Sequence, residues 1–392
     1  MVLLFWIAVF IVFYSFIGYG ILLYVITRLK RLASSSYKKS HSFEVNHDSL
    51  PTCTLIIAAY NEAGCLEEKI KNCQSLTYPR GKLRILFVTD GSTDDSPEII
   101  LKHSDLLLLH QDKREGKIIA IDRAMQHVST ETVVFTDANA ILNKDALINI
   151  AKHYDNFSVG AVSGEKRVIS RAPDEDSGIG EGIYWKYEST LKKWDSELYS
   201  VVGAAGELFG IKTHLYTKLP HDTILDDFML SMTIAKAGYR IVYEPDSYAT
   251  ETASISIREE LKRRIRIAAG GIQSISRLKS LFNPFKHPIL SFQYISHRVL
   301  RWTITPFLLP VIFFTNIWLY QDNPSKVYAA LLLVQSIFYL LALVGMYFQR
   351  KKVKIRLFFI PFYFCVMNYA VVMGIIKYFR GTQSSVWEKA KR

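Results

Sequence analysis

The sequence lacks several features by which catalytic and metal sites are often recognised. It has four cysteines in 392 residues, and their spacing does not match a metal site, so we interpret them as reduced thiols that fill space. No Ser–His or Cys–His pattern indicates a covalent nucleophile. No nucleic-acid-binding motif is present, so we expect no nucleic-acid partner despite a net charge of +12. Much of that charge lies beside apolar runs, where it suits an anionic lipid surface.

Charged residues are nearly absent from four long apolar runs, which predicts membrane-spanning helices. Residues 1–27 form the first run, and the others lie at about 302–320, 327–348 and 357–376. Each is long enough to cross a hydrocarbon layer of about 30 Å, which takes about 20 helical residues. No basic residue precedes the first run and no small-residue cleavage site follows it. We therefore interpret it as an uncleaved anchor rather than a removable signal peptide.

Basic residues beside the runs predict the orientation of the chain. Arg28, Lys30 and Arg31 follow the first run, and the loop 349–356 contains five basic residues. Because flanking Lys and Arg tend to stay in the cytoplasm, we expect an integral protein of the cell inner membrane whose middle domain is cytosolic. Three full spans after that domain would place the basic tail 378–392 outside. We favour a cytosolic tail, with one run re-entrant or interfacial.

Between the first and second runs, short apolar strands alternate with amphipathic helices. The expected strands are 53–59, 84–89, 105–110 and 132–136, and the expected helices are 65–75, 96–103, 117–128 and 145–154. Such alternation is typical of an α/β fold with a Rossmann-like, mainly parallel sheet. These sheets bind ligands at the carboxyl ends of their strands, where loops and helix starts converge.

Three of the expected strands end in polar side chains. The first strand leads into Tyr60 and Glu62, the second into Asp90, and the fourth into Asp137 and Asn139. Any one of these ends could be a simple turn, since Asp, Asn, Gly and Ser all favour turns. Three such ends in one sheet favour a common ligand site.

Lys117 is an independent indication of a phosphate site. A lysine at a helix start works against the helix dipole, which favours anions there. Lys113 and Arg114 lie nearby and Gly116 frees the backbone, so the segment suits a phosphate group; a solvated basic loop is the alternative. Carboxylates together with a basic helix start predict a nucleotide diphosphate bridged by a divalent metal, Mg²⁺ or Mn²⁺.

Six strings in order resemble the family 2 glycosyltransferases, which have the GT-A fold. The strings are AAYNEAGCLEEKI, TDGSTDDS, GKIIAIDRA, TDANA, GAAGELFGIK and ILDDFML. In layout the chain is similar to membrane-embedded synthases of cellulose, chitin, hyaluronan and poly-N-acetylglucosamine. The resemblance implies a GT-A domain over 50–254, amphipathic interface helices over 255–300 and transmembrane helices over 301–377.

The resemblance also implies roles for single residues. Those expected to bind the nucleotide-sugar donor are Tyr60, Glu62, Asp90, Lys117 and Asp137. Asp137 and Asn139 would hold the metal; Asn139 replaces the family's second acid, but its amide oxygen can still ligate a hard cation. Asp227, with Asp226 beside it, would be the general base that takes the acceptor's proton. The pair also suits a helix amino terminus, which favours acids.

The acceptor site is expected at small residues near the end of the domain. The segment 203–209 allows the backbone to approach a ligand closely, and the resemblance implies acceptor contacts at Gly206 and Glu207. Trp185 could stack on a sugar ring, or it could be an ordinary packing aromatic.

One expected motif differs from the family pattern. Processive members usually have Gln-x-x-Arg-Trp on an interface helix, where this chain has Arg263 for the Gln and Ile267 for the Trp. Trp387 in the tail is a candidate replacement for the missing aromatic. Arg263, Arg264 and Arg266 could clamp the donor diphosphate or lie on lipid headgroups.

We therefore expect a membrane-bound, inverting glycosyltransferase that moves a sugar from a UDP-sugar to a growing cell-wall or extracellular polysaccharide. The expected partners are the donor, the polysaccharide, membrane lipids and accessory export subunits. Two alternatives stay open: transfer of one sugar to a lipid-linked acceptor, and an inactive glycosyltransferase-like scaffold. Intact Asp90, Asp137 and Asp227 argue against the scaffold.

Overall fold

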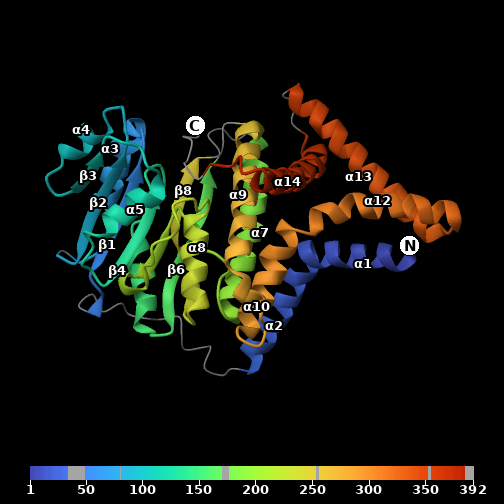
Figure 1. Ribbon diagram of the computed structural model, residues 1–392, viewed down its shortest axis with the longest axis horizontal. Helices are drawn as coiled ribbons and strands as arrows, with labels where there is room; N and C mark the ends of the chain where they lie inside the picture. Colours follow the sequence, from blue (N-terminus) through green and yellow to red (C-terminus); the bar gives the residue numbers. More distant parts are fainter. Residues whose placement is uncertain (34–48, 80, 170–175, 253–255, 352–354, 385–392) are drawn as a thin grey trace.

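The structure combines a mixed sheet with a set of long helices that lie beside it (Figure 1). It is a computed structural model that describes residues 1–33, 49–79, 81–169, 176–252, 256–351 and 355–384. The sheet has eight strands in the order β3-β2-β1-β4-β7-β6-β8-β5.

The first half of the sheet is parallel, as the alternating pattern predicts. β1 (Cys53–Ala59) pairs with β2 (Leu83–Asp90) and with β4 (Thr132–Asp137), and β3 (Leu107–Gln111) pairs with β2. The carboxyl ends of β1, β2 and β4 therefore open at one edge of the sheet. This edge is where the sequence predicts a ligand site.

Helices cover both faces of this half, which explains why its strands are apolar throughout. α3 (Ala63–Gln74), α4 (Ser96–Leu101) and α6 (Ala146–Ala151) pack on one face. α5 (Lys117–Met125) and α8 (Asp226–Lys236) pack on the other. α3 to α6 lie where the sequence predicts helices.

The second half of the sheet is mixed and was not assigned from the sequence. β7 (Phe209–Lys212) runs antiparallel to β4 and to β6 (Val159–Ile169), and β8 (Arg240–Thr252) runs parallel to β6. The short β5 (Ile141–Leu142) closes the edge. The prediction of a mainly parallel α/β sheet is confirmed for the parallel core, to which these strands add an antiparallel part.

The prediction of apolar helices at both ends of the chain is also confirmed. α1 (Val2–Phe13) and α2 (Tyr19–Ala33) form one candidate span, and α13 (Lys326–Arg350) and α14 (Arg356–Phe379) provide two more. A further candidate is bent by 61° between Pro288–Trp302 and α12 (Thr305–Asp322). By length and composition, the described residues thus contain one N-terminal and two or three C-terminal spans.

α9 (Ile257–Arg277) connects the sheet domain to the apolar helices. It lies beside α7 (Asp176–Leu198), between the sheet and the long helices (Figure 1). Its segment 268–271 has only small residues, which allows other parts of the chain to come close. A Cβ added to Gly374 of α14 would lie 2.5 Å from the Cβ of Ala268, and one added to Gly271 would lie 2.5 Å from the Trp302 ring.

Gly374 provides a test of this close contact. Gly374→Ala should destabilise the protein by about 1–3 kcal/mol, because an added methyl group has to displace packed backbone. Thermal unfolding of the purified protein in detergent measures the change. Gly64→Ala is the matched control: no atom lies within 4 Å of its added Cβ. Equal melting shifts for the two variants would contradict the close contact.

Candidate active site

Asp90 lies at the end of β2. One of its carboxylate oxygens accepts hydrogen bonds from the backbone, and the other accepts none from the described residues. Its Oδ2 accepts hydrogen bonds from the backbone N–H groups of Glu115, at 3.0 Å, and Gly116, at 2.6 Å. Its Oδ1 is buried, and no described residue bonds it. A buried acceptor without a donor is costly, so this oxygen is suited to receive an N–H group from a ligand.

Tyr60 and Glu62 lie beside Asp90 at the same sheet edge. The guanidinium carbon of Arg114 lies 3.7 Å from the centre of the Tyr60 ring. Glu62 begins α3, and its backbone N–H donates to the Ser96 hydroxyl at 3.0 Å. The end of β1 therefore presents a flat aromatic–guanidinium stack next to the unused oxygen of Asp90.

Lys117 and Asp137 form an ion pair between α5 and the end of β4. Lys117 Nζ donates to Asp137 Oδ1 at 2.7 Å. Burial lowers the pKa of Lys117, but the carboxylates of Asp137, Asp226 and Asp227 outweigh that effect and raise it above its ordinary value. A permanently charged ammonium among carboxylates marks the place where a diphosphate and a cation would meet.

Asp226 and Asp227 form the first turn of α8. The backbone N–H of Phe228 donates to Asp227 Oδ1 at 2.8 Å. The other carboxylate oxygen of Asp227, Oδ2, faces Gly206: a Cβ added to Gly206 would lie 3.0 Å from it. Burial and, after it, the charge of Asp226 raise the pKa of Asp227 to about 6. A carboxylate with such a pKa is suited to accept a proton near neutral pH.

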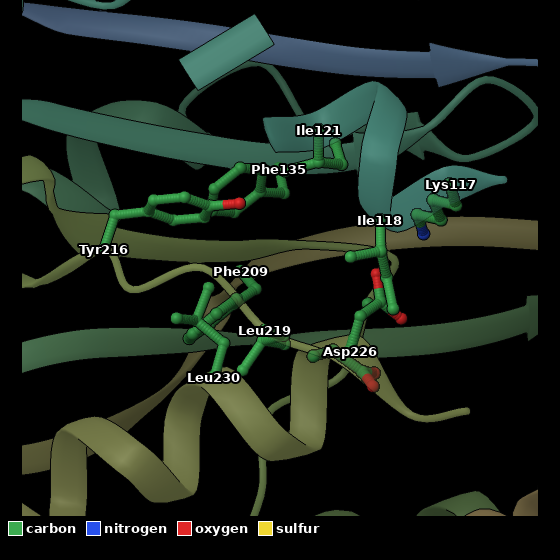
Figure 2. A pocket seen from close by; sticks show the side chains of 11 residues that line it. Lys117, Ile118, Ile121, Phe135, Phe209, Tyr216, Leu219, Asp226 and Leu230 are labelled. Carbon is green, nitrogen blue, oxygen red and sulfur yellow. The ribbon is translucent and has the colours of Figure 1, made fainter. Parts of the chain in front are cut away.

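A largely apolar cavity of about 40 Å³ opens beside these carboxylates. Figure 2 shows Lys117 and Asp226 at one end and Tyr216 at the other, with Phe135 and Phe209 between them. The Tyr216 hydroxyl donates to Asp122, so it offers little to a ligand. The remaining lining residues are Ile118, Ile121, Gly206, Leu219, Asp227 and Leu230.

A buried charge network connects Glu207 to Asn139. The Lys166 ammonium bonds Glu207 and lies 2.6 Å from Glu251 Oε2. Glu251 in turn accepts from the Asn139 amide nitrogen at 3.1 Å. Burial raises the pKa of Glu207, but Lys166 and Arg263 outweigh it and hold this pKa well below its usual range. Glu207 thus remains charged and fixed in place.

The other expected arginines take different positions. Arg263 Nη2 donates to Glu207 at 3.1 Å, and Arg264 Nε donates to Glu260 at 2.6 Å. Arg266 donates to the Ile224 carbonyl, while its buried Nε has no partner among the described residues.

Arg266 and Trp185 contact different parts of the site. Burial lowers the pKa of Arg266, and the charges of Asp226 and Asp227 oppose that effect. The Trp185 ring lies 5.3 Å from Lys166 Nζ and 5.8 Å from the Arg264 guanidinium, on the Glu207 side. Trp387 falls outside the described residues.

The residues expected to hold a metal have suitable oxygen atoms but are few. The described part of the chain contains no group of three or more His, Cys, Asp or Glu side chains that could hold a metal ion. Asp137 supplies a carboxylate, and the Asn139 oxygen accepts no hydrogen bond from the described residues. One or two such oxygens fit Mg²⁺ or Mn²⁺ when substrate phosphates complete the coordination.

Lys166 and Glu251 were missed from the sequence. Both side chains are almost fully buried, and both lie in strands of the mixed half of the sheet. The only signal for Lys166 is its place in the charged run Glu165-Lys166-Arg167 of the strand VGAVSGEKRVI, which does not reveal its partners.

A parallel sheet core with a nucleotide-type site at its strand ends, followed by an acidic helix start, defines a glycosyltransferase with the GT-A fold. Residues 54–219 match the family model described as Glycosyl transferase family 2. Over these residues the match agrees with the family that the six motifs predict.

Similar proteins include bacterial polysaccharide synthases. The chain is 26% identical over 262 residues to a poly-beta-1,6-N-acetyl-D-glucosamine synthase of Staphylococcus aureus strain MSSA476, a match that covers 64% of this chain and 61% of the relative. A synthase with the same name from Staphylococcus epidermidis is 25% identical over 253 residues, covering 62% and 60%. The chain thus spans about three fifths of the length of these curated relatives.

A solved structure is similar over nearly the whole chain. It is a mannosyltransferase of Pyrobaculum calidifontis in complex with GDP-Man and Mn²⁺, with a TM-score of 0.69 and 26% identity. The match covers 96% of this chain and 99% of the mannosyltransferase. The likeness therefore includes the apolar helices as well as the sheet domain.

The raised pKa of Asp227 leads to a pH prediction. If Asp227 is the base, kcat/KM should fall about tenfold per pH unit below pH about 6, because the carboxyl group is then protonated. Asp226→Asn removes a neighbouring negative charge and should move this acid limb to lower pH. The pH–rate profile measures both effects, with the exposed Asp246→Asn as control. An acid limb that stays in place in Asp226→Asn would contradict the assignment.

Proposed function

We propose that this chain is an inverting, metal-dependent glycosyltransferase that extends a polysaccharide from a UDP-sugar donor. The observation that carries the proposal is the convergence at one sheet edge of Asp90, the Lys117–Asp137 pair and Asp227. These groups suit, in that order, a nucleobase, a diphosphate and an acceptor hydroxyl. The similarity to named polysaccharide synthases supports a polymeric product.

The hydrogen bonds of Asp90 favour uracil as the base. Uracil offers one ring N–H, which the single unused oxygen Oδ1 can accept. Guanine offers an N–H and an amino group side by side, which pair best with both oxygens of a carboxylate. Because two backbone N–H groups occupy Oδ2, that second oxygen is unavailable.

The apolar cavity favours a donor sugar with an N-acetyl group. A substituent on C2 lies next to the reacting carbon C1, within reach of a cavity that opens beside Asp227. Hydroxyl groups would find few partners among its isoleucine, leucine and phenylalanine side chains, whereas an acetyl methyl group is suited to them. The named product of the staphylococcal relatives, an N-acetylglucosamine polymer, supports this choice.

In the proposed reaction, Asp227 takes the proton from an acceptor hydroxyl while the hydroxyl oxygen attacks C1 from the side opposite the diphosphate. Lys117 and Arg266 stabilise the negative charge that develops on the leaving diphosphate. Asp137 and Asn139 would hold Mg²⁺ or Mn²⁺, which would supply further positive charge to the leaving group.

The membrane arrangement suits a donor from the cytosol. The basic flanks of the first run and of the loop 349–356 favour a cytosolic sheet domain in the cell inner membrane. Membrane lipids, and accessory export subunits for the product, would be its further partners. Transfer of one sugar to a lipid-linked acceptor remains the second candidate, since a protein named a mannosyltransferase has the same architecture over nearly its whole chain.

Incubation of the full chain in nanodiscs with labelled UDP-GlcNAc, UDP-Glc or GDP-Man, each with Mn²⁺, tests the proposal. We expect a long polymer from UDP-GlcNAc only, and loss of turnover when EDTA removes the metal. One added sugar in the lipid fraction would favour the second candidate, and no turnover with any donor would refute both. Asp227→Asn should lower kcat by at least about a hundredfold, since base catalysis contributes about that much, and leave UDP affinity within about twofold.

The choice of base is tested by nucleotide affinity. UDP should bind more tightly than GDP by about tenfold or more, and Asp90→Asn should remove most of that preference, because a hydrogen bond to a charged group contributes about 1.5–3 kcal/mol. Isothermal titration calorimetry measures both nucleotides. Asp105→Asn, at an acid away from the strand end, is the control. Equal affinities for UDP and GDP in the unaltered protein would contradict the proposed base.

A further inference from the structure

Lys192 is a buried lysine whose ammonium has no partner among the described residues. The residue lies on α7 and is 5% exposed. No described residue lies within hydrogen-bond or ion-pair distance of its Nζ, although the carboxylates of Glu188, Glu207 and Asp227 act on it from further away. Buried lysines are rare unless paired, because removing an ammonium from water costs several kcal/mol. The packing of α7 therefore does not account for Lys192.

Trp302 has a second donor, its indole N–H, that has no partner among the described residues, and its ring packs next to the residue after the proposed base. Its ring lies over Gly271 of α9, where an added Cβ would be 2.5 Å from the indole. The same ring packs against Phe228, which follows Asp227, with ring centres 5.2 Å apart. Trp302 is only partly buried, and its indole N–H donates to no described residue. The indole N–H of a buried tryptophan usually donates a hydrogen bond to an acceptor.

Arg298 connects these two residues. It bonds Glu188, which lies one helical turn before Lys192, and its guanidinium carbon lies 5.6 Å from the centre of the Trp302 ring. Arg298 and Glu188 thus form an ion pair with each other. The Lys192 ammonium and the Trp302 N–H remain as donors without a partner among the described residues, and the charge of Asp227 acts on Lys192. Neither atom is sealed by protein, since neither is among the buried polar atoms that lack a partner.

The unused donors favour a ligand rich in oxygen. Three ammonium protons and one indole N–H need acceptors, and sugar hydroxyl and ring oxygens supply them. An apolar lipid chain would cover these donors without pairing them, at a cost of about 1–3 kcal/mol for each donor that it removes from water. Lys192 lies on α7 and Trp302 on α11 (Leu300–Trp302), and neither residue lines the apolar cavity between α5 and α8.

We infer that Lys192 and Trp302 form an acceptor subsite, in which the ammonium and the indole N–H hydrogen-bond the oxygens of the acceptor sugar whose hydroxyl faces Asp227. This inference rests on the proposed function, because it needs a glycan acceptor. It assigns acceptor recognition to two residues outside the motifs of the sequence, one on α7 and one at the bend before α12.

The test compares acceptor and donor parameters in the full chain in nanodiscs. The acceptor probe is a mixture of short oligomers released from the polymer that the unaltered protein makes. Lys192→Met and Trp302→Leu should each raise the KM for these oligomers about tenfold or more, as expected for a lost hydrogen bond to a charged or buried group. UDP affinity by calorimetry should remain within about twofold. Release of UDP to water without acceptor should also persist.

Matched variants separate recognition from folding. Lys193→Met changes the exposed neighbour of Lys192, and Trp318→Leu changes an exposed tryptophan of α12, so both should leave the acceptor KM unchanged. Trp302→Phe keeps most of the ring and removes the N–H, which tests the donor if Trp302→Leu does not fold. An unchanged acceptor KM in Lys192→Met and Trp302→Phe would overturn the inference, as would an equal loss of UDP affinity. If the unaltered protein makes no polymer, the proposed function fails before this test begins.

Discussion

The site depends on one buried lysine held between two carboxylates. Lys166 joins Glu207, in the loop that faces the proposed base, to Glu251 on β8, and Glu251 holds Asn139 after β4. Removing one member of such a buried group leaves a charge uncompensated, at a cost of about 3–5 kcal/mol. The network therefore fixes the relative positions of the expected metal-binding turn and the acceptor loop, although Lys166 belongs to no motif.

α9 places a second constraint on the site. Its small residues allow α14 to approach closely on one side, and its arginines reach Glu207 and the loop before α8 on the other. An apolar helix and the candidate active site are thus both in contact with α9. A shift of α14 against α9 would therefore also move Arg263 and Arg266, which lie on α9.

Much of the fold could be predicted from the sequence because its elements have local signals. The strands of the parallel core are short apolar runs that end in polar turns, and the spans are long runs almost without charge. β7 and β5 are only four and two residues long, too short for a periodic pattern. β6 carries three successive charged residues, of which Lys166 is buried, and they interrupt its apolar run. Their partners lie 41 and 85 positions away along the chain, so no local pattern reveals them.

The sequence by itself determined the parallel core, the apolar helices and the motif residues Asp90, Lys117, Asp137 and Asp227, and it predicted the family. Motifs and periodicity are properties of neighbouring residues. Only the tertiary structure decided which oxygen of Asp90 is unused and that Lys192 is buried without a partner among the residues described. It also decided that Trp302, rather than an aromatic on α9, lies beside Phe228. These features depend on contacts between segments that are far apart in the sequence. Burial and hydrogen-bond partners arise from tertiary packing, so the neighbouring residues in the sequence do not reveal them.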